Sequence, residues 1–306
     1  MFNSKIEHAW VAVGTPVGGS FRLPTMAAGD LPALLRDIRR RIHTDTDRIY
    51  IIGEEDGADA AWIAAIMYSN PFAGIIAISG FPRIPYPEQS YALLLPNLRG
   101  TPFLSIWTDD PKGQAPSPVS AVNRAIVDFA LAAGLPFETA TLAEVQSGVA
   151  TIPQRVIAAA TSKPRQPQSR VQHWFRYLPQ GNAGWLRATD LAGDVWDDEQ
   201  ISIAVTASAN RDEFITETIK QKLFYISGRI DGQTINVDTK RVGGIELRLS
   251  PEQVDFSQPV TVFINGRNRF EGMLEPSIKG LLESAYEDWD FQHPVYFRKT
   301  FSINAK

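Results

Sequence analysis

The sequence predicts an α/β domain with a parallel sheet, followed by an antiparallel β-sandwich. In the first half of the chain, short apolar runs alternate with segments whose apolar residues recur at helical spacing. This pattern is typical of a parallel sheet with helices on both faces. In the second half, apolar and polar residues alternate along short segments, as in strands with one buried face. The polar stretch SKPRQPQSR (162–170), with two prolines, separates the two patterns.

The composition indicates a globular protein and excludes cysteine chemistry. The 306 residues are 44% hydrophobic and 21% charged, which are ordinary globular values and suggest about two domains. We expect an α/β domain over 1–163, a linker over 164–170 and a β-sandwich module over 171–306. No cysteine is present, which excludes disulfides, thiolate catalysis and cysteine-bound zinc.

Charge and hydropathy also exclude some partners. The net charge of −4 gives no basic face for nucleic acid. We interpret Arg36, Arg39, Arg40 and Arg41, at helical spacing, as a solvated helix face. From the first residues we expect no signal peptide, and no apolar run approaches the roughly 18 residues of a membrane span. We therefore expect no membrane embedding and, by default, a cytoplasmic protein.

The elements of the first domain follow in order along the chain. Apolar or β-branched runs predict strands at 8–14, 48–54, 73–80, 102–110 and 136–142. Helical periodicity predicts helices at 31–42, 56–70, 122–133 and 152–160. Asp30 is a plausible N-cap of the first helix, Pro71 ends the second, and Gly134 caps the third.

The second half predicts an immunoglobulin-like module built mainly of strands. Alternating patterns predict strands at 200–207, 222–227, 234–239, 245–250, 260–264 and 295–301. Asp231-Gly232 and Asn265-Gly266 are hairpin signals, because both residues of a tight turn must reach positive φ. One helix is expected between the strands, at about 277–287.

The junction between the second strand and the second helix has a distinctive sequence. RIYIIG runs into GEEDG (53–57) and then into an alanine-rich helix. A strand, a glycine-flanked turn and a helix form the context of the nucleophile elbow, G-x-S-x-G. The central residue of such a turn stands at the carboxyl edge of the sheet. In this chain that residue is Glu55.

Three longer segments carry a resemblance to a known family. DRIYIIGEEDGADAAWIAAIMYSNPFAGIIAISG (47–80) resembles the elbow region of α/β-hydrolases of the esterase, depolymerase and prolyl-oligopeptidase type. TPFLSIWTDDPKGQAPSPVSAVNRAIVDFALAAGLPFETATL (101–142) is similar to the segment that brings the triad acid. DFSQPVTVFINGRNRFEGMLEPSIKGLLESAYEDWD (255–290) resembles a β-module behind such domains in some bacterial hydrolases.

When the family's catalytic residues are matched one by one to this sequence, the catalytic pattern is incomplete. The nucleophile position holds Glu55, and the acid position matches Asp110, with Asp109 as its neighbour. The histidine position, near Gln146, is unfilled. A serine nucleophile needs such a base within hydrogen-bond reach. Compared with the family, we also expect the chain to be shortened before the elbow strand. The chain's histidines are His8, His43, His173 and His293.

The resemblance therefore implies a hydrolase-like protein without catalysis, in which binding or scaffolding remains and no cofactor is needed. The alternative is a hydrolase of ester or peptide bonds, completed by a partner chain or upstream region, or using Glu55 as an unusual nucleophile. Glu55 and Asp110 could also form an acid–base pair. The acids Glu54, Glu55, Asp56, Asp109 and Asp110 either bind a hard cation or are solvated.

The strand predicted at 8–14 bears on assembly. It is apolar apart from His8 and would lie at the N-terminal edge of the sheet, where an uncovered strand invites pairing. We expect a homo-oligomer formed through this edge by a two-fold axis. A protein partner, or the β-module folding back over the edge, are the alternatives.

Overall fold

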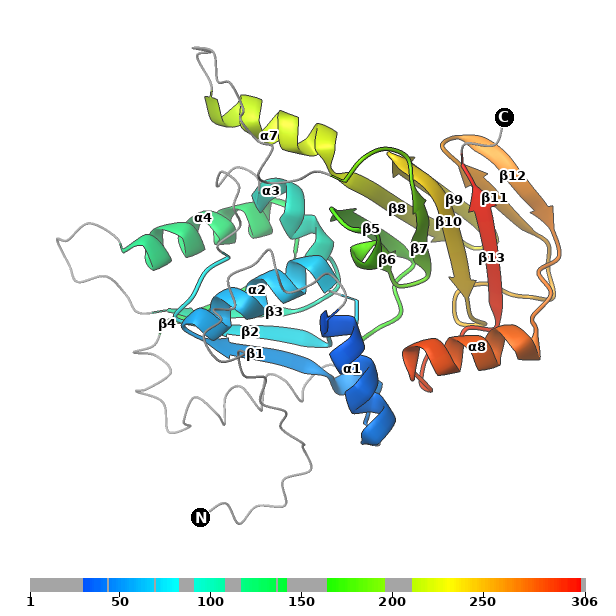
Figure 1. Cartoon of the computed structure of the whole chain (residues 1–306), viewed down its shortest axis with the longest axis horizontal. Helices are drawn as coiled ribbons and strands as arrows, with labels where there is room; N and C mark the ends of the chain where they lie inside the picture. Colours follow the sequence, from blue (N-terminus) through cyan, green and yellow to red (C-terminus); the bar gives the residue numbers. More distant parts are fainter. Residues whose placement is uncertain are drawn as a thin grey trace.

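The computed structural model describes residues 30–42, 44–68, 70–82, 91–107, 117–135, 137–141, 164–195 and 211–303. Several predictions from the sequence fall outside these residues. They are the strands at 8–14 and 200–207, the helix at 152–160, and the positions of Asp109, Asp110 and Gln146. Figure 1 shows an α/β part with α1, α2 and α4 around a parallel sheet, beside a part made mainly of two β-sheets.

The parallel sheet predicted for the first half is confirmed. Its strands are β1 (Tyr50–Glu54), β2 (Gly74–Ile78), β3 (Phe103–Trp107) and β4 (Phe137–Thr141). They lie in the order β1-β2-β3-β4, and each neighbouring pair is parallel. Every residue of β2 is buried, which explains why its sequence GIIAI is a continuous apolar run rather than an alternation.

Helices bury one face of this sheet. They are α1 (Asp30–Arg41), α2 (Asp56–Tyr68), α3 (Tyr91–Leu94) and α4 (Pro118–Ala132), with 3-10 helices η1 (Thr46–Arg48) and η3 (Leu95–Leu98). Ile75 and Ala77, two residues apart on β2, share a buried cluster with Trp62 of α2 and Ile126 of α4. Side chains at this spacing point to the same face of a strand, so α2 and α4 pack on that face.

The C-terminal end of α4 matches its predicted signal, and its N-terminal cap is a residue that we had not predicted. Ser117 is the N-cap, and its hydroxyl accepts a hydrogen bond from the Ser120 N–H at 3.2 Å. Gly134 follows the helix with φ +63°, and its N–H donates to the Leu131 carbonyl. The predicted C-terminal cap is confirmed, because glycine adopts positive φ without a Cβ penalty.

The second half contains two further sheets. One has the order β13-β10-β7-β6 and the other β12-β11-β9-β8-β5. Apolar side chains of both sheets, among them Leu186, Leu247, Ile226 and Val262, form one buried cluster. The strands are β5 (Arg170–Phe175), β6 (Asn182–Ala183), β7 (Leu186–Leu191), β8 (Phe224–Asp231), β9 (Thr234–Lys240), β10 (Val242–Leu249), β11 (Val260–Ile264), β12 (Arg267–Gly272) and β13 (Phe297–Ser302).

The pairing of these strands differs in one respect from the prediction. Both hairpins occur: Gly232 lies between β8 and β9, and Asn265-Gly266 lies between β11 and β12, with positive φ at all three residues. However, β9 and β11 pair in parallel, whereas we predicted an antiparallel module. A parallel pair needs a long crossover between its strands, and the chain from β9 to β11 makes that crossover through β10 in the other sheet.

Two helices accompany the β-sheets. α8 (Ile278–Asp288) confirms the helix predicted near 277–287, and its N-cap Ser277 accepts a hydrogen bond from the Gly280 N–H at 2.9 Å. Helix α7 (Arg211–Lys222) was not predicted. Because it extends to Lys222, the strand expected at 222–227 begins only at Phe224. Ile219 of α7 is buried in the cluster of the α/β part, so this helix joins the two halves (Figure 1).

Candidate functional site

The turn after β1 places Glu55 at the carboxyl edge of the parallel sheet. Glu55 has φ +51°, in the left-handed region that few non-glycine residues adopt. Its N–H donates to the Ile78 carbonyl at 2.8 Å, and its own carbonyl accepts from the N–H groups of Ala58 (2.9 Å) and Asp59 (3.2 Å). These bonds hold a strained strand-to-helix turn in place.

Two glycines make this turn possible. A Cβ added to Gly53 would lie 1.9 Å from the Gly57 carbonyl oxygen, so only glycine fits there. A Cβ on Gly80, in the neighbouring turn after β2, would lie 2.5 Å from the Ala58 Cβ. By contrast, a Cβ on Gly57 would meet nothing within 4 Å. The turn is therefore closely packed at Gly53 and Gly80 and not at Gly57.

The neighbouring turn is also strained and is supported by buried polar side chains. Ser79 has φ +59°, and its N–H donates to the Ile106 carbonyl at 2.7 Å. Asp59 accepts a hydrogen bond from the Phe81 N–H at 2.8 Å. Beneath the turn, the buried Ser105 hydroxyl donates to Asn123 Oδ1 at 2.8 Å, and Asn123 Nδ2 donates to the Gly80 carbonyl at 3.0 Å.

The side chains at this edge are carboxylates. Glu54, Glu55 and Asp56 are all exposed. Asp109, Asp110 and Gln146 lie outside the described residues, so the acid and histidine positions expected from the resemblance remain predictions. Among the described residues, no three His, Asp or Glu side chains are grouped to hold a metal ion.

The two histidines within the described residues lie at the other end of the sheet. His173 Nε2 lies 3.2 Å from the Met67 carbonyl oxygen, to which it can only donate. Met67 is in the last turn of α2, roughly 16 Å along the helix from the Glu55 turn. His293 Nε2 contacts Asp47 Oδ1 at 2.5 Å, before the start of β1 and roughly 16 Å of strand from Glu55. Neither is placed to serve the Glu55 turn.

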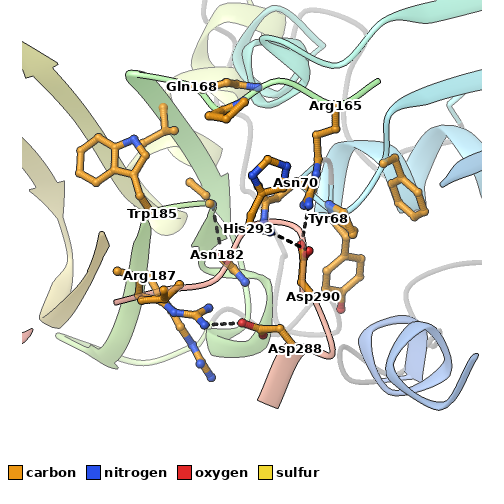
Figure 2. A pocket seen from close by; sticks show the side chains of 18 of the residues that line it. Tyr68, Asn70, Arg165, Gln168, Asn182, Trp185, Arg187, Asp288, Asp290 and His293 are labelled. Atoms are coloured by element: carbon orange, nitrogen blue, oxygen red, sulfur yellow. Dashed lines mark hydrogen bonds and ion pairs between the residues drawn. The ribbon is translucent and has the colours of Figure 1, made fainter. Parts of the chain in front are cut away.

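A pocket of about 440 Å³ lies at this opposite, amino-terminal edge, between the α/β part and the β-sheets (Figure 2). Asn70 to Phe72 precede β2, and Gly100 and Thr101 precede β3; all line the pocket, together with residues 165–168 and the segment after α8. Its volume is within the range of small-molecule sites. No sequence pattern indicated this pocket, because its walls come from segments that are far apart in the chain.

An ion pair closes one side of this pocket. Arg165 Nη2 donates to Asp290 Oδ2 at 2.5 Å, and Arg165 also contacts Asp47 Oδ1 at 3.4 Å. The Thr46 hydroxyl donates to Asp290 Oδ1 at 2.6 Å. Burial by itself would raise the pKa of Asp290, but Arg165, the Thr46 hydrogen bond and the charge of Arg39 lower it to about 2. Figure 2 shows this pair bridging the two halves.

Arg39 corrects the interpretation of the basic residues on the first helix. Arg36, Arg40 and Arg41 are exposed, as expected for a solvated face. Arg39 is instead half-buried at the pocket, where its Nη1 donates to the Asp288 carbonyl at 3.1 Å. The helical spacing did not distinguish it from its neighbours, because the segment that covers it is 249 residues away in sequence.

Comparisons with known proteins found one weak structural similarity. No protein family model matches the chain, and no curated protein matches it. A solved structure described as a thermostable esterase aligns with 17% sequence identity and a TM-score of 0.33, over 44% of this chain and 36% of that chain. The chain thus spans about a third of that esterase. Similarity at this level carries no argument about activity.

No helix in the described part of the chain has the length and apolarity to cross a bilayer.

Proposed function

We propose that the chain is a non-catalytic α/β-hydrolase-like protein with a β-sandwich module behind it, and that its role is binding or scaffolding. The observation that carries this proposal is the turn at Glu55. Its positive φ, its flanking glycines and its position between a parallel strand and a helix are those of a nucleophile elbow. The residue in the nucleophile position is a carboxylate.

The chemistry of the turn supports the absence of hydrolysis. A carboxylate can form an acyl or glycosyl intermediate, but a base must then activate water to release it. The described histidines cannot do so, since His173 and His293 contact Met67 and Asp47 at the opposite edge of the sheet. The exposed neighbours Glu54 and Asp56 add negative charge, which would oppose an oxyanion at this position.

The turn remains well supported despite the changed residue. The Asp59–Phe81 and Ser105–Asn123–Gly80 hydrogen bonds hold both turns at the carboxyl edge. In open α/β sheets this edge is where ligands bind. A well-supported edge that neither described histidine reaches favours a surface that binds over one that reacts.

The test is turnover of short-chain p-nitrophenyl esters and chromogenic peptides by the purified protein. We expect rates equal to the buffer background. The matched variants are Glu55→Ala and Glu54→Ala, two adjacent exposed carboxylates of which only the first has the elbow conformation. Turnover that is lost in Glu55→Ala and kept in Glu54→Ala would overturn the proposal in favour of a Glu55-dependent hydrolase.

A further inference from the structure

The guanidinium of Arg39 has one edge without a hydrogen-bond partner. Nη1 donates to the Asp288 carbonyl, while Nε and Nη2 are buried and have no partner among the described residues. Nε–H and the adjacent Nη2–H point the same way, so together they form the fork that fits the two oxygens of a carboxylate or phosphate. Arg39 lines the pocket described above.

Three other pocket-lining side chains carry buried donors without a hydrogen-bond partner. Arg99 Nε, Trp185 Nε1 and Arg248 Nε make no hydrogen bond within the described part of the chain, although Arg248 Nε lies 3.8 Å from Glu246 Oε2. A buried donor that makes no hydrogen bond destabilises the folded state, and such groups are rare in folded proteins. Five N–H groups without a hydrogen-bond partner, on four side chains of one pocket, indicate that an acceptor belongs there.

The charges around the pocket give the sign of that acceptor. Six arginines and four carboxylates line it, so positive charge is in excess. Three of the arginines are paired with carboxylates: Arg165 contacts Asp290, Arg248 contacts Asp288, and Arg187 lies 3.7 Å from Glu287. Burial lowers the pKa of Arg39 and the charge of Arg165 lowers it further, although Asp290 and Asp288 oppose this shift. A bound anion would compensate both unfavourable effects.

We infer that this pocket is a binding site for a small anionic molecule, whose carboxylate or phosphate group is held by the Nε/Nη2 edge of Arg39, with Arg99 and Trp185 donating to other acceptors of the same molecule. The site lies at the amino-terminal edge of the sheet, opposite Glu55. It therefore goes beyond the proposed function and does not depend on whether the Glu55 turn is catalytic.

The position of the site suggests what binding would do. Its walls come from α1, from loops of the α/β part, from residues 165–168 and from the β-sheets. A ligand that contacts all of these segments would favour the arrangement of the two halves seen in this structure. Binding to the folded state alone stabilises a protein by mass action, so ligand affinity and thermal stability are linked.

The experiment measures the melting temperature of the full chain against inorganic phosphate and, separately, succinate, with sodium chloride at matched ionic strength. We expect a saturable rise with at least one of the two anions at concentrations up to about 20 mM. The two titrations distinguish a phosphate site from a carboxylate site. No saturable rise with either anion would overturn the inference and leave ordered water as the partner of these donors.

Two variants place the effect in the pocket. Arg39→Gln should weaken the apparent affinity by about tenfold or more, because it removes the charged fork. Arg40→Gln is the matched control, since Arg40 is the exposed neighbour on the same helix and does not line the pocket. If Arg39→Gln does not fold, Arg99→Gln serves in its place. Equal affinities in the wild type and the pocket variant would contradict the inference.

Discussion

Asn97 and Trp174 exchange two hydrogen bonds across the junction of the two halves. Asn97 Nδ2 donates to the Trp174 carbonyl at 2.8 Å, and the Trp174 N–H donates to Asn97 Oδ1 at 2.8 Å. β5, which contains Trp174, is the last strand of its sheet. The amide of Asn97 therefore pairs with an edge strand as another strand would, and it covers backbone groups that would otherwise be open to a second chain.

Asn97→Asp should uncouple the two halves. Asn97 is only 3% exposed, and its Nδ2 also donates to the Ile66 carbonyl at 3.0 Å. A carboxylate there would face two carbonyl oxygens without a donor, a loss of about 3 kcal/mol or more. Calorimetry should show one unfolding transition in the wild type and two in the variant. A variant that melts like the wild type would show that the pair does not couple the halves.

His173 should make stability depend on pH between about 6.5 and 4. Burial lowers the pKa of His173 to about 4, although the carbonyls of Met67 and Gln180 oppose the shift. The unfolded chain binds the proton first as the pH falls, so stability is lost progressively from pH 6.5 to 4, by about 3 kcal/mol. Urea unfolding at several pH values measures this. His173→Gln should flatten the slope in this window, and an unchanged slope would rule out His173 as its source.

Asp290 should act in a lower pH window. Its folded pKa of about 2 lies below the ordinary aspartate value of 3.8. The Asp290 carboxylate therefore contributes its full stabilisation above about pH 4 and loses it as the pH falls towards 2. The contribution is about 2 kcal/mol. Asp290→Asn should be less stable than the wild type at pH 7, and the difference should shrink towards pH 2. A difference that stays constant with pH would show that the Arg165–Asp290 pair does not contribute through charge.

Gly53 and Gly57 are a matched pair for the turn at Glu55. Gly53→Ala places a Cβ 1.9 Å from a backbone oxygen, so it should destabilise the protein by about 3 kcal/mol or more. Gly57→Ala meets no atom within 4 Å and lies in the first turn of α2. It should stabilise by about 0.5–1 kcal/mol, because alanine favours helix. Denaturant unfolding compares them, and equal effects would refute the close packing of the turn.

Local patterns predicted much of the fold. The strands β1 to β4, their parallel arrangement and the helices α2, α4 and α8 were predicted from the periodicity of apolar residues, and the end of α4 from the cap residue Gly134. The strands β5 and β7 were missed, because RVQHWF and LRATDL mix charged and apolar residues. Helix α7 was missed since its segment, RDEFITETIKQK, has a weak apolar pattern. Its Ile219 is buried only through contact with the α/β core.

The candidate site was predictable only in part. Glu55 was found from its glycine-flanked turn, whose geometry is set by residues close in sequence. The pocket was not found, because Arg39 and Asp288 meet across 249 residues and Arg165 lies in a stretch that reads as a plain linker. The buried Glu246 and Arg248 of β10 are similar: their partners Arg298 and Asp288 come from other elements. Long-range charge pairs leave no periodic signal.

We propose that the Glu55 turn is a nucleophile elbow that neither histidine of the described residues can activate. The most direct measurement is the reaction of the variant Glu55→Ser with a fluorophosphonate probe, followed by intact-mass spectrometry, with the wild type as control. A serine in this turn reacts rapidly only if a histidine accepts its proton. We predict labelling no faster than that of the wild type. Rapid, stoichiometric labelling of the introduced serine would contradict the account and show that a base lies within hydrogen-bond reach of this position.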